Sequence, residues 1–86
     1  MNKTIYKYPL KIQDEQTLEI HEYPQFLHVG LDPNETPCLW ALVDTEQEKE
    51  RIDIFVVGTG HPIPRFAREH IGSFKQGPYM WHIFIS

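Results

Sequence analysis

The feature of this sequence that most constrains its fold is an apolar run from Ile52 to Val57, which only Asp53 interrupts. A short run of this kind, rich in β-branched residues, predicts a buried central strand. The run stops at Gly58, and a stretch with a second glycine and two prolines follows as far as Pro64. Glycine frees the backbone and proline cannot extend a hydrogen-bonded ladder, so we expect the strand to end in a loop here.

Six other segments have the alternating or continuously apolar pattern of short strands. They are Thr4–Ile12, Thr17–Glu22, Gln25–Leu31, Pro37–Asp44, Ile71–Gln76 and Tyr79–Ile85. Pro9 marks the first as an edge strand or a strand with a break, because proline donates no ladder hydrogen bond. The fourth is apolar on both faces and is expected to lie inside its sheet. The last is also apolar on both faces, which predicts either an interior strand or an oligomer contact.

One segment, Pro64–His70, has the pattern of a short helix. Proline suits the first turn of a helix, and Gly72 stands where a C-terminal glycine is common. The chain has 86 residues, which is enough for a single domain, residues 1–86. We therefore predict a mainly β (α+β) fold, a small antiparallel β-sandwich or half-open barrel of about seven strands with one short helix.

Charge and cysteine content exclude several classes of protein. Twelve Asp and Glu against eight Lys and Arg give a formal net charge of −4, so a basic face for long nucleic acid is not expected. Cys38 is the only cysteine, which rules out an intramolecular disulfide and suits the cytoplasm. No apolar stretch approaches the roughly 20 residues that span a bilayer, and Met1–Lys11 lacks the apolar core of a signal peptide.

The loop after the central strand, with the residues that follow it, is the best candidate for a ligand site. The expected binding residues are Gly58, Thr59, Gly60, His61, Arg65, Arg68, Tyr79 and Trp81. The glycines allow backbone N–H groups to point together next to a helix start, a combination that favours anions. Arg65 and Arg68 are three residues apart, so a helix would hold both side chains near that end. These features favour a phosphate group, with Tyr79 or Trp81 stacking on a base.

Other features favour a simpler interpretation of the same residues. Pro62 and Pro64 remove two N–H groups that a phosphate cradle would use. Ile63 stands where a dinucleotide fingerprint has its third glycine, and no Lys-Ser or Lys-Thr pair follows as in a P-loop. The loop is then a tight strand-to-helix turn that simply requires glycine. Tyr79 and Trp81 likewise either contact a ligand or partner at the surface or belong to the core.

Catalytic, metal-binding and cofactor-binding patterns are weak. The five histidines lack the spacing of metal ligands, and we expect structural roles for them. They are His21, His28, His61, His70 and His82. Neither Ser73 nor Ser86 sits in a nucleophile elbow, and Cys38 lies in an apolar strand where a thiol is inert packing. We expect a protein that is not an enzyme and that has no cofactor and no metal.

Four stretches carry a family resemblance. They are the opening IYKYPL (residues 5–10), the strand Pro37–Val43, the central GTGHPIP (residues 58–64) and the closing WHIF (residues 81–84). Together they resemble a family of small uncharacterised proteins encoded by tailed bacteriophages and prophages. The resemblance implies an accessory phage protein in the cytoplasm of a bacterial host. Small phage proteins are often counter-defence factors that block a host nuclease or sequester a nucleotide immune signal.

The favoured hypothesis is a non-enzymatic phage counter-defence protein, a homo-oligomer that sequesters a small phosphorylated, linear or cyclic, nucleotide. One alternative is an anti-CRISPR-like inhibitor that binds a host defence enzyme through an acidic face. That face would comprise Asp14, Glu15, Glu19, Glu22 and the segment Glu46–Glu50. Another alternative is a small virion accessory protein without a ligand. The expected partner is thus a small nucleotide or a host defence protein, and not long nucleic acid or a membrane.

Overall fold

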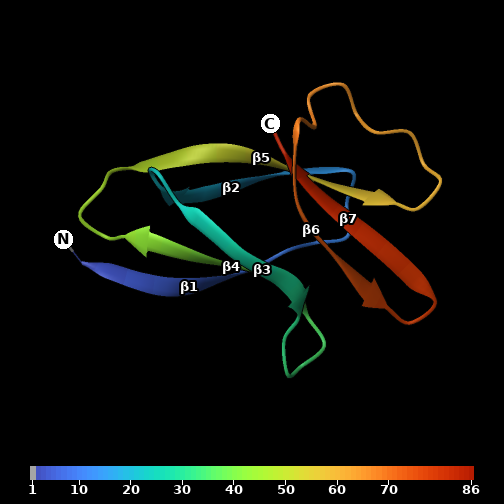
Figure 1. Cartoon of the computed structure of the whole chain (residues 1–86), viewed down its shortest axis with the longest axis horizontal. Helices are drawn as coiled ribbons and strands as arrows, with labels where there is room; N and C mark the ends of the chain where they lie inside the picture. The colour runs from blue at the N-terminus through green and yellow to red at the C-terminus, as the bar shows by residue number, and fades with distance from the viewer. Residues whose placement is uncertain (1) are drawn as a thin grey trace.

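The computed structural model describes residues 2–86 as seven antiparallel β-strands in two sheets (Figure 1). The strands are β1 (Lys3–Pro9), β2 (Glu15–His21), β3 (Gln25–Leu31), β4 (Pro37–Asp44), β5 (Lys49–Gly58), β6 (Glu69–Gln76) and β7 (Tyr79–Ile85). One sheet has the order β1-β4-β3 and the other the order β2-β5-β7-β6. None of the residues from 2 to 86 belongs to a helix, so nothing in that range offers a helix that could cross a membrane.

The two sheets pack face to face as a β-sandwich, which confirms the predicted architecture. The most deeply buried side chains include Leu39, Ile54 and Ile83, and each comes from a strand inside its sheet, β4, β5 or β7. Long apolar runs therefore correctly mark the interior strands, which have a hydrogen-bonded neighbour along each edge. β1, which carries Pro9, is an edge strand as predicted. β7 lies between β5 and β6, so its apolar faces are those of an interior strand.

The predicted helix over Pro64–His70 is wrong. Residues 59–68 form an irregular loop, in which the Ala67 N–H donates to the Pro64 carbonyl at 3.1 Å. The Arg68 N–H donates to the Ile85 carbonyl at 2.9 Å, and β6 begins at the next residue. A helix of two turns is marginal by itself, whereas pairing along β7 satisfies a whole row of backbone groups. The strand pairing therefore prevails over the local proline and glycine signals.

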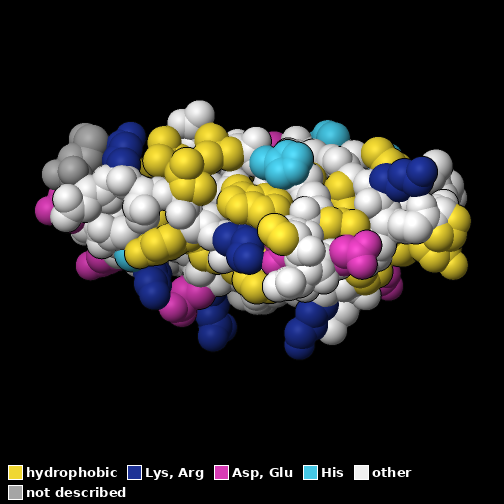
Figure 2. Space-filling view, turned by 90° about the horizontal axis from the view of Figure 1, so that it is seen from below, with side chains coloured by type: hydrophobic (Ala, Val, Ile, Leu, Met, Phe, Trp, Pro, Cys, Tyr) yellow, Lys and Arg dark blue, Asp and Glu magenta, His cyan; other side chains and the backbone are white. Residues whose placement is uncertain are grey.

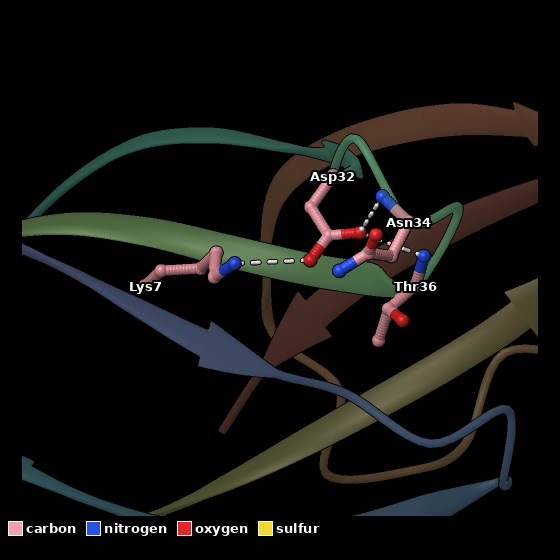
Figure 3. Close-up of polar contacts among 4 residues, drawn as sticks. All are labelled: Lys7, Asp32, Asn34 and Thr36. Carbon is pink, nitrogen blue, oxygen red and sulfur yellow. Dashed lines mark hydrogen bonds and ion pairs between the residues drawn. The ribbon is translucent and has the colours of Figure 1, made fainter.

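The turn between β3 and β4 is held by a buried carboxylate (Figure 3). Asp32 Oδ1 accepts hydrogen bonds from the N–H groups of Asn34, at 2.8 Å, and Thr36, at 3.0 Å. Asp32 Oδ2 accepts from Lys7 Nζ at 2.9 Å, and the Asp32 side chain is only 6% exposed. Because Lys7 belongs to β1 and Asp32 follows β3, this ion pair links the two edge strands of the three-stranded sheet.

Candidate functional site

The glycine loop begins where β5 ends, and both of its glycines have a structural reason. A Cβ on Gly58 would lie 3.2 Å from both His61 Nδ1 and Trp81 Cζ3, so a larger residue would push on these rings. The His61 N–H closes the turn by donating to the Gly58 carbonyl at 3.1 Å. Gly60 has a φ of 90°, a conformation that other residues avoid. The turn therefore requires glycine at both positions whether or not a ligand binds.

A pocket of about 320 Å³ lies between this loop and the start of β7. Its lining residues are Gly58, Thr59, His61, Pro78, Tyr79, Met80 and Trp81. The Tyr79 and Trp81 rings are stacked, with centroids 5.6 Å apart and an angle of 26° between their planes. Tyr79 is 60% exposed, whereas Trp81 is half-buried and its Nε1 donates to Gln76 Oε1 at 3.1 Å. Five of the eight residues predicted from the sequence thus meet at one pocket.

The other three predicted residues lie elsewhere on the loop. Gly60 lines a second pocket of about 270 Å³, together with Ile63, His82 and Phe84 among others. Arg65 and Arg68 are exposed and line neither pocket. Because the segment is not a helix, a spacing of three residues does not place the two arginines on the same side of it.

Some backbone N–H groups of the loop already donate hydrogen bonds within the protein. The Thr59 N–H donates to the Met80 carbonyl at 3.4 Å, and the His61 N–H is taken by the turn. Pro62 and Pro64 have no N–H group to offer. An anion at this loop would therefore depend on side chains more than on these backbone groups.

A chain of side-chain hydrogen bonds fixes the first residue of the loop, and sequence reasoning missed it. Thr59 Oγ1 lies 2.8 Å from His82 Nε2, and His82 Nδ1 lies 2.7 Å from Ser73 Oγ. Ser73 Oγ lies a further 2.9 Å from His70 Nε2. The pairing of Ser73 with His82 follows from the β6–β7 hairpin, which joins Gln76 to Tyr79 and continues without a break to this pair. The signal in the sequence is the short separation of the segments Ile71–Gln76 and Tyr79–Ile85 by Gly77 and Pro78, which is typical of a hairpin.

This series of hydrogen bonds connects the glycine loop to the sheet. Both ring nitrogens of His82 are engaged, and each hydroxyl in the chain can accept one hydrogen bond while donating another. Within residues 2–86, no group of three or more His, Cys, Asp or Glu side chains is placed to hold a metal ion. Cys38 is fully buried, and this burial raises the pKa of its thiol, which makes the thiolate scarce.

The chain belongs to the DUF7352 family, a domain of unknown function, which it matches over residues 1–86. Comparison with curated proteins and with solved structures found no match. The family match covers the whole chain and carries no assigned activity, so function has to be inferred from the geometry of the pockets.

Proposed function

We propose that this member of the DUF7352 family is a non-enzymatic binding protein that captures a small phosphorylated nucleotide, linear or cyclic, beside its glycine loop. The observation that carries the proposal is the pocket that joins the loop to the stacked rings of Tyr79 and Trp81. An exposed tyrosine held by stacking on its neighbour presents a flat face to a base. Stacking of a base on an aromatic side chain contributes about 1–3 kcal/mol and does not depend on which base it is.

Polar groups for the rest of a nucleotide lie on the same loop. The Thr59 hydroxyl and the His61 ring line the pocket and can hydrogen-bond to a ribose or a phosphate. Arg65 and Arg68 follow a few residues later, are exposed, and have no carboxylate partner among residues 2–86. The Arg65 guanidinium lies over the Phe66 ring, 5.7 Å from its centroid, a contact that leaves its N–H groups able to bind a phosphate. The loop thus offers cationic groups, and β7 offers the aromatic surface.

Calorimetric titration with mononucleotides, cyclic mononucleotides and cyclic dinucleotides tests this proposal. The Tyr79→Ala variant should bind the best ligand about 5- to 150-fold more weakly, which corresponds to the loss of about 1–3 kcal/mol of stacking. Tyr23→Ala is the matched control, because Tyr23 is 81% exposed and lies outside the loop pockets. Unchanged affinity in Tyr79→Ala, or no binding of any nucleotide by the parent, would refute the proposal.

We place this binding activity in phage counter-defence within a bacterial cytoplasm. The support is the resemblance of residues 5–10, 37–43, 58–64 and 81–84 to small proteins of tailed phages and prophages. Expression of the protein in bacteria with a nucleotide-signalled immune system should restore plaque formation by a sensitive phage. The Tyr79→Ala variant should fail to restore it, while Tyr23→Ala should act like the parent. If both variants restore plaque formation equally, the counter-defence activity does not depend on the pocket.

The acidic-face alternative has less support from the arrangement of charges. Glu19 on β2 lies directly opposite Arg51 on β5, and its carboxylate is 4.0 Å from Lys49 Nζ. These cations break up the negative surface that an inhibitor would present to a basic cleft.

We also propose that the protein self-associates. Ile5, which is 57% exposed, and Leu42 are paired on the outer face of the three-stranded sheet, next to the pair formed by Lys7 and Trp40. Figure 2, which views the molecule from below Figure 1, shows several hydrophobic patches on this side of the molecule, separated by charged and other side chains. Light scattering should show an oligomer at micromolar concentration, and Ile5→Lys should shift it toward the monomer. A parent protein that is monomeric at that concentration would exclude self-association.

A further inference from the structure

A larger pocket, of about 590 Å³, lies at another part of the sandwich and shares no lining residue with the two glycine-loop pockets. Its apolar lining comes from both sheets, with Phe26 of β3 facing Ile52, Ile71 and Ile85 of the other sheet. Ile85 is buried, and the other three are half-buried. The rest of the lining is mostly polar and comprises Pro24, Gln25, Glu50, Glu69, His70 and Ser86. A concave site of about 300 to 1,000 Å³ that combines apolar walls with polar groups is typical of small-molecule binding.

β3 and β6 come into close contact next to this pocket. At the contact, a Cβ on Gly72 would lie 2.5 Å from Val29 Cγ2, so only glycine allows the two strands to touch there. Each strand then has an irregular register immediately before this contact, between Phe26 and His28 in β3 and between His70 and Gly72 in β6. Bulges bend a strand and are frequent next to functional sites. Phe26 and His70, at the two bulges, both line the opening.

Two carboxylates, Glu50 and Glu69, line the rim of this pocket, and both side chains are exposed. Glu50 is paired with Ile20, which is 1% exposed, and Glu69 is paired with Ile85, which is 8% exposed. Neither glutamate has an ion pair or a side-chain hydrogen bond within residues 2–86, and no Lys or Arg lines the pocket. Both carboxylates are therefore unpaired and open to solvent at the mouth of the pocket.

We propose that this pocket is a second binding site and that it takes a small organic cation, an ammonium or guanidinium group on an apolar body. The apolar walls bury the body, and Glu50 and Glu69 pair with the cationic group. The net charge of −4 adds a general attraction for cations. The site is independent of the nucleotide pocket, because it uses other residues and the opposite charge.

NMR titration with three probes that share a phenyl ring tests the proposal. Phenethylamine carries a positive charge, 2-phenylethanol none, and phenylacetate a negative charge. Phenethylamine at millimolar concentration should shift the resonances of Ile52, Ile71 and Ile85, and its affinity should exceed that of the alcohol, while phenylacetate should not bind. Equal shifts from all three probes, or no shifts at these isoleucines, would overturn the proposal.

Variants assign the charge preference to the two glutamates. Glu50→Gln and Glu69→Gln should each weaken phenethylamine binding about ten-fold, which is the usual loss for one charge-assisted contact. Glu48→Gln is the matched control, since Glu48 is exposed and two residues away but does not line the pocket. Well-dispersed spectra of each variant establish that it is folded. If both pocket variants bind as the parent does, the carboxylates do not recognise the cation and the proposal fails.

Discussion

The β3–β4 turn and the β5–β6 loop are two connections built in opposite ways. In the turn, one buried carboxylate, Asp32, accepts two backbone N–H groups and pairs with Lys7 (Figure 3). The loop, residues 59–68, is twice as long as the five-residue span 32–36 and exposes Ile63 and Phe66, at 57% and 55%. Its one side-chain hydrogen bond to the sheet, within the described chain, runs from Thr59 to His82.

The two connections differ in whether their polar side chains are bonded within the protein or left free for a ligand. Asp32 and its partners satisfy one another, so the turn has little left with which to bind a ligand. The loop leaves its cationic and apolar side chains facing solvent, and its hydrogen bonds to the sheet come from its two ends, Thr59 and Arg68, to β7. Binding residues are often found on loops that a rigid scaffold holds in this way. Substitutions in the turn should therefore affect stability, and substitutions in the loop should affect binding.

The largest effect on stability is expected for Asp32→Ala. The substitution leaves the Asn34 and Thr36 N–H groups and the Lys7 ammonium without their shared acceptor. Thermal unfolding should show a lower Tm than for any of the loop variants below. Asp14→Ala is the control, because Asp14 is exposed and its side chain has no hydrogen bond or ion pair among the described residues. An equal Tm for the two variants would show that the turn is not anchored through Asp32.

The same carboxylate should make stability depend on acid pH. The Thr36 N–H, the Lys7 ammonium and the Asn34 N–H lower the pKa of Asp32 in the folded protein. A carboxyl with a lowered folded pKa stabilises the protein above its ordinary pKa, and this contribution is lost as the pH falls through the folded pKa. As the pH is lowered below about 4, the Tm of the parent should therefore decrease. The Tm of Asp32→Asn should decrease less steeply over the same pH range. Parallel curves in circular dichroism would contradict the prediction.

A smaller loss of stability is expected for Gly60→Ala in the loop. Gly60 has a φ of 90°, and no atom lies within 4 Å of the place where a Cβ would be. The cost is therefore backbone strain alone, about 1–2 kcal/mol for a residue with a side chain in a left-handed conformation. Urea unfolding measures it. Gly77→Ala, with a φ of 57° and equally open space, provides a matched comparison in a hairpin turn. An unchanged unfolding free energy in Gly60→Ala would mean that the loop relaxes freely.

The smallest effect on stability is expected for Arg65→Ala and Arg68→Ala. Both side chains are exposed and outside the pockets, so the unfolding free energy should change by less than about 0.5 kcal/mol. If they hold the phosphate of a nucleotide, each substitution should weaken binding about ten-fold or more. Arg51→Ala is the control, because Arg51 is exposed on β5 opposite Glu19. Parent-like nucleotide affinity in both loop variants would place the phosphate away from the arginines.

The sequence by itself determined where most of the strands lie. The bounds of β3, β4 and β7 agree with those expected from the pattern, and the other strands differ by a few residues at their ends. Alternation, apolar runs and turn residues are local properties, so they can be recognised without knowing the fold. The hairpin between β6 and β7 was predictable for the same reason, and its register aligns Ser73 with His82.

The tertiary structure alone decided the helix, the anchored turn and the pockets. Residues 64–70 have a helix pattern, yet β7 offers an edge with which Glu69 and His70 pair. The ion pair of Lys7 with Asp32 spans 25 residues of sequence, and the loop pocket joins Gly58, Thr59 and His61 to residues 78–81. Likewise, Glu50 and Glu69 face one pocket only because their strands lie in register with β2 and β7. The loop in place of a helix, the ion pair and the pockets all depend on which strands become neighbours. The burial of the whole sandwich core determines these neighbours, and no single segment of the chain does so alone.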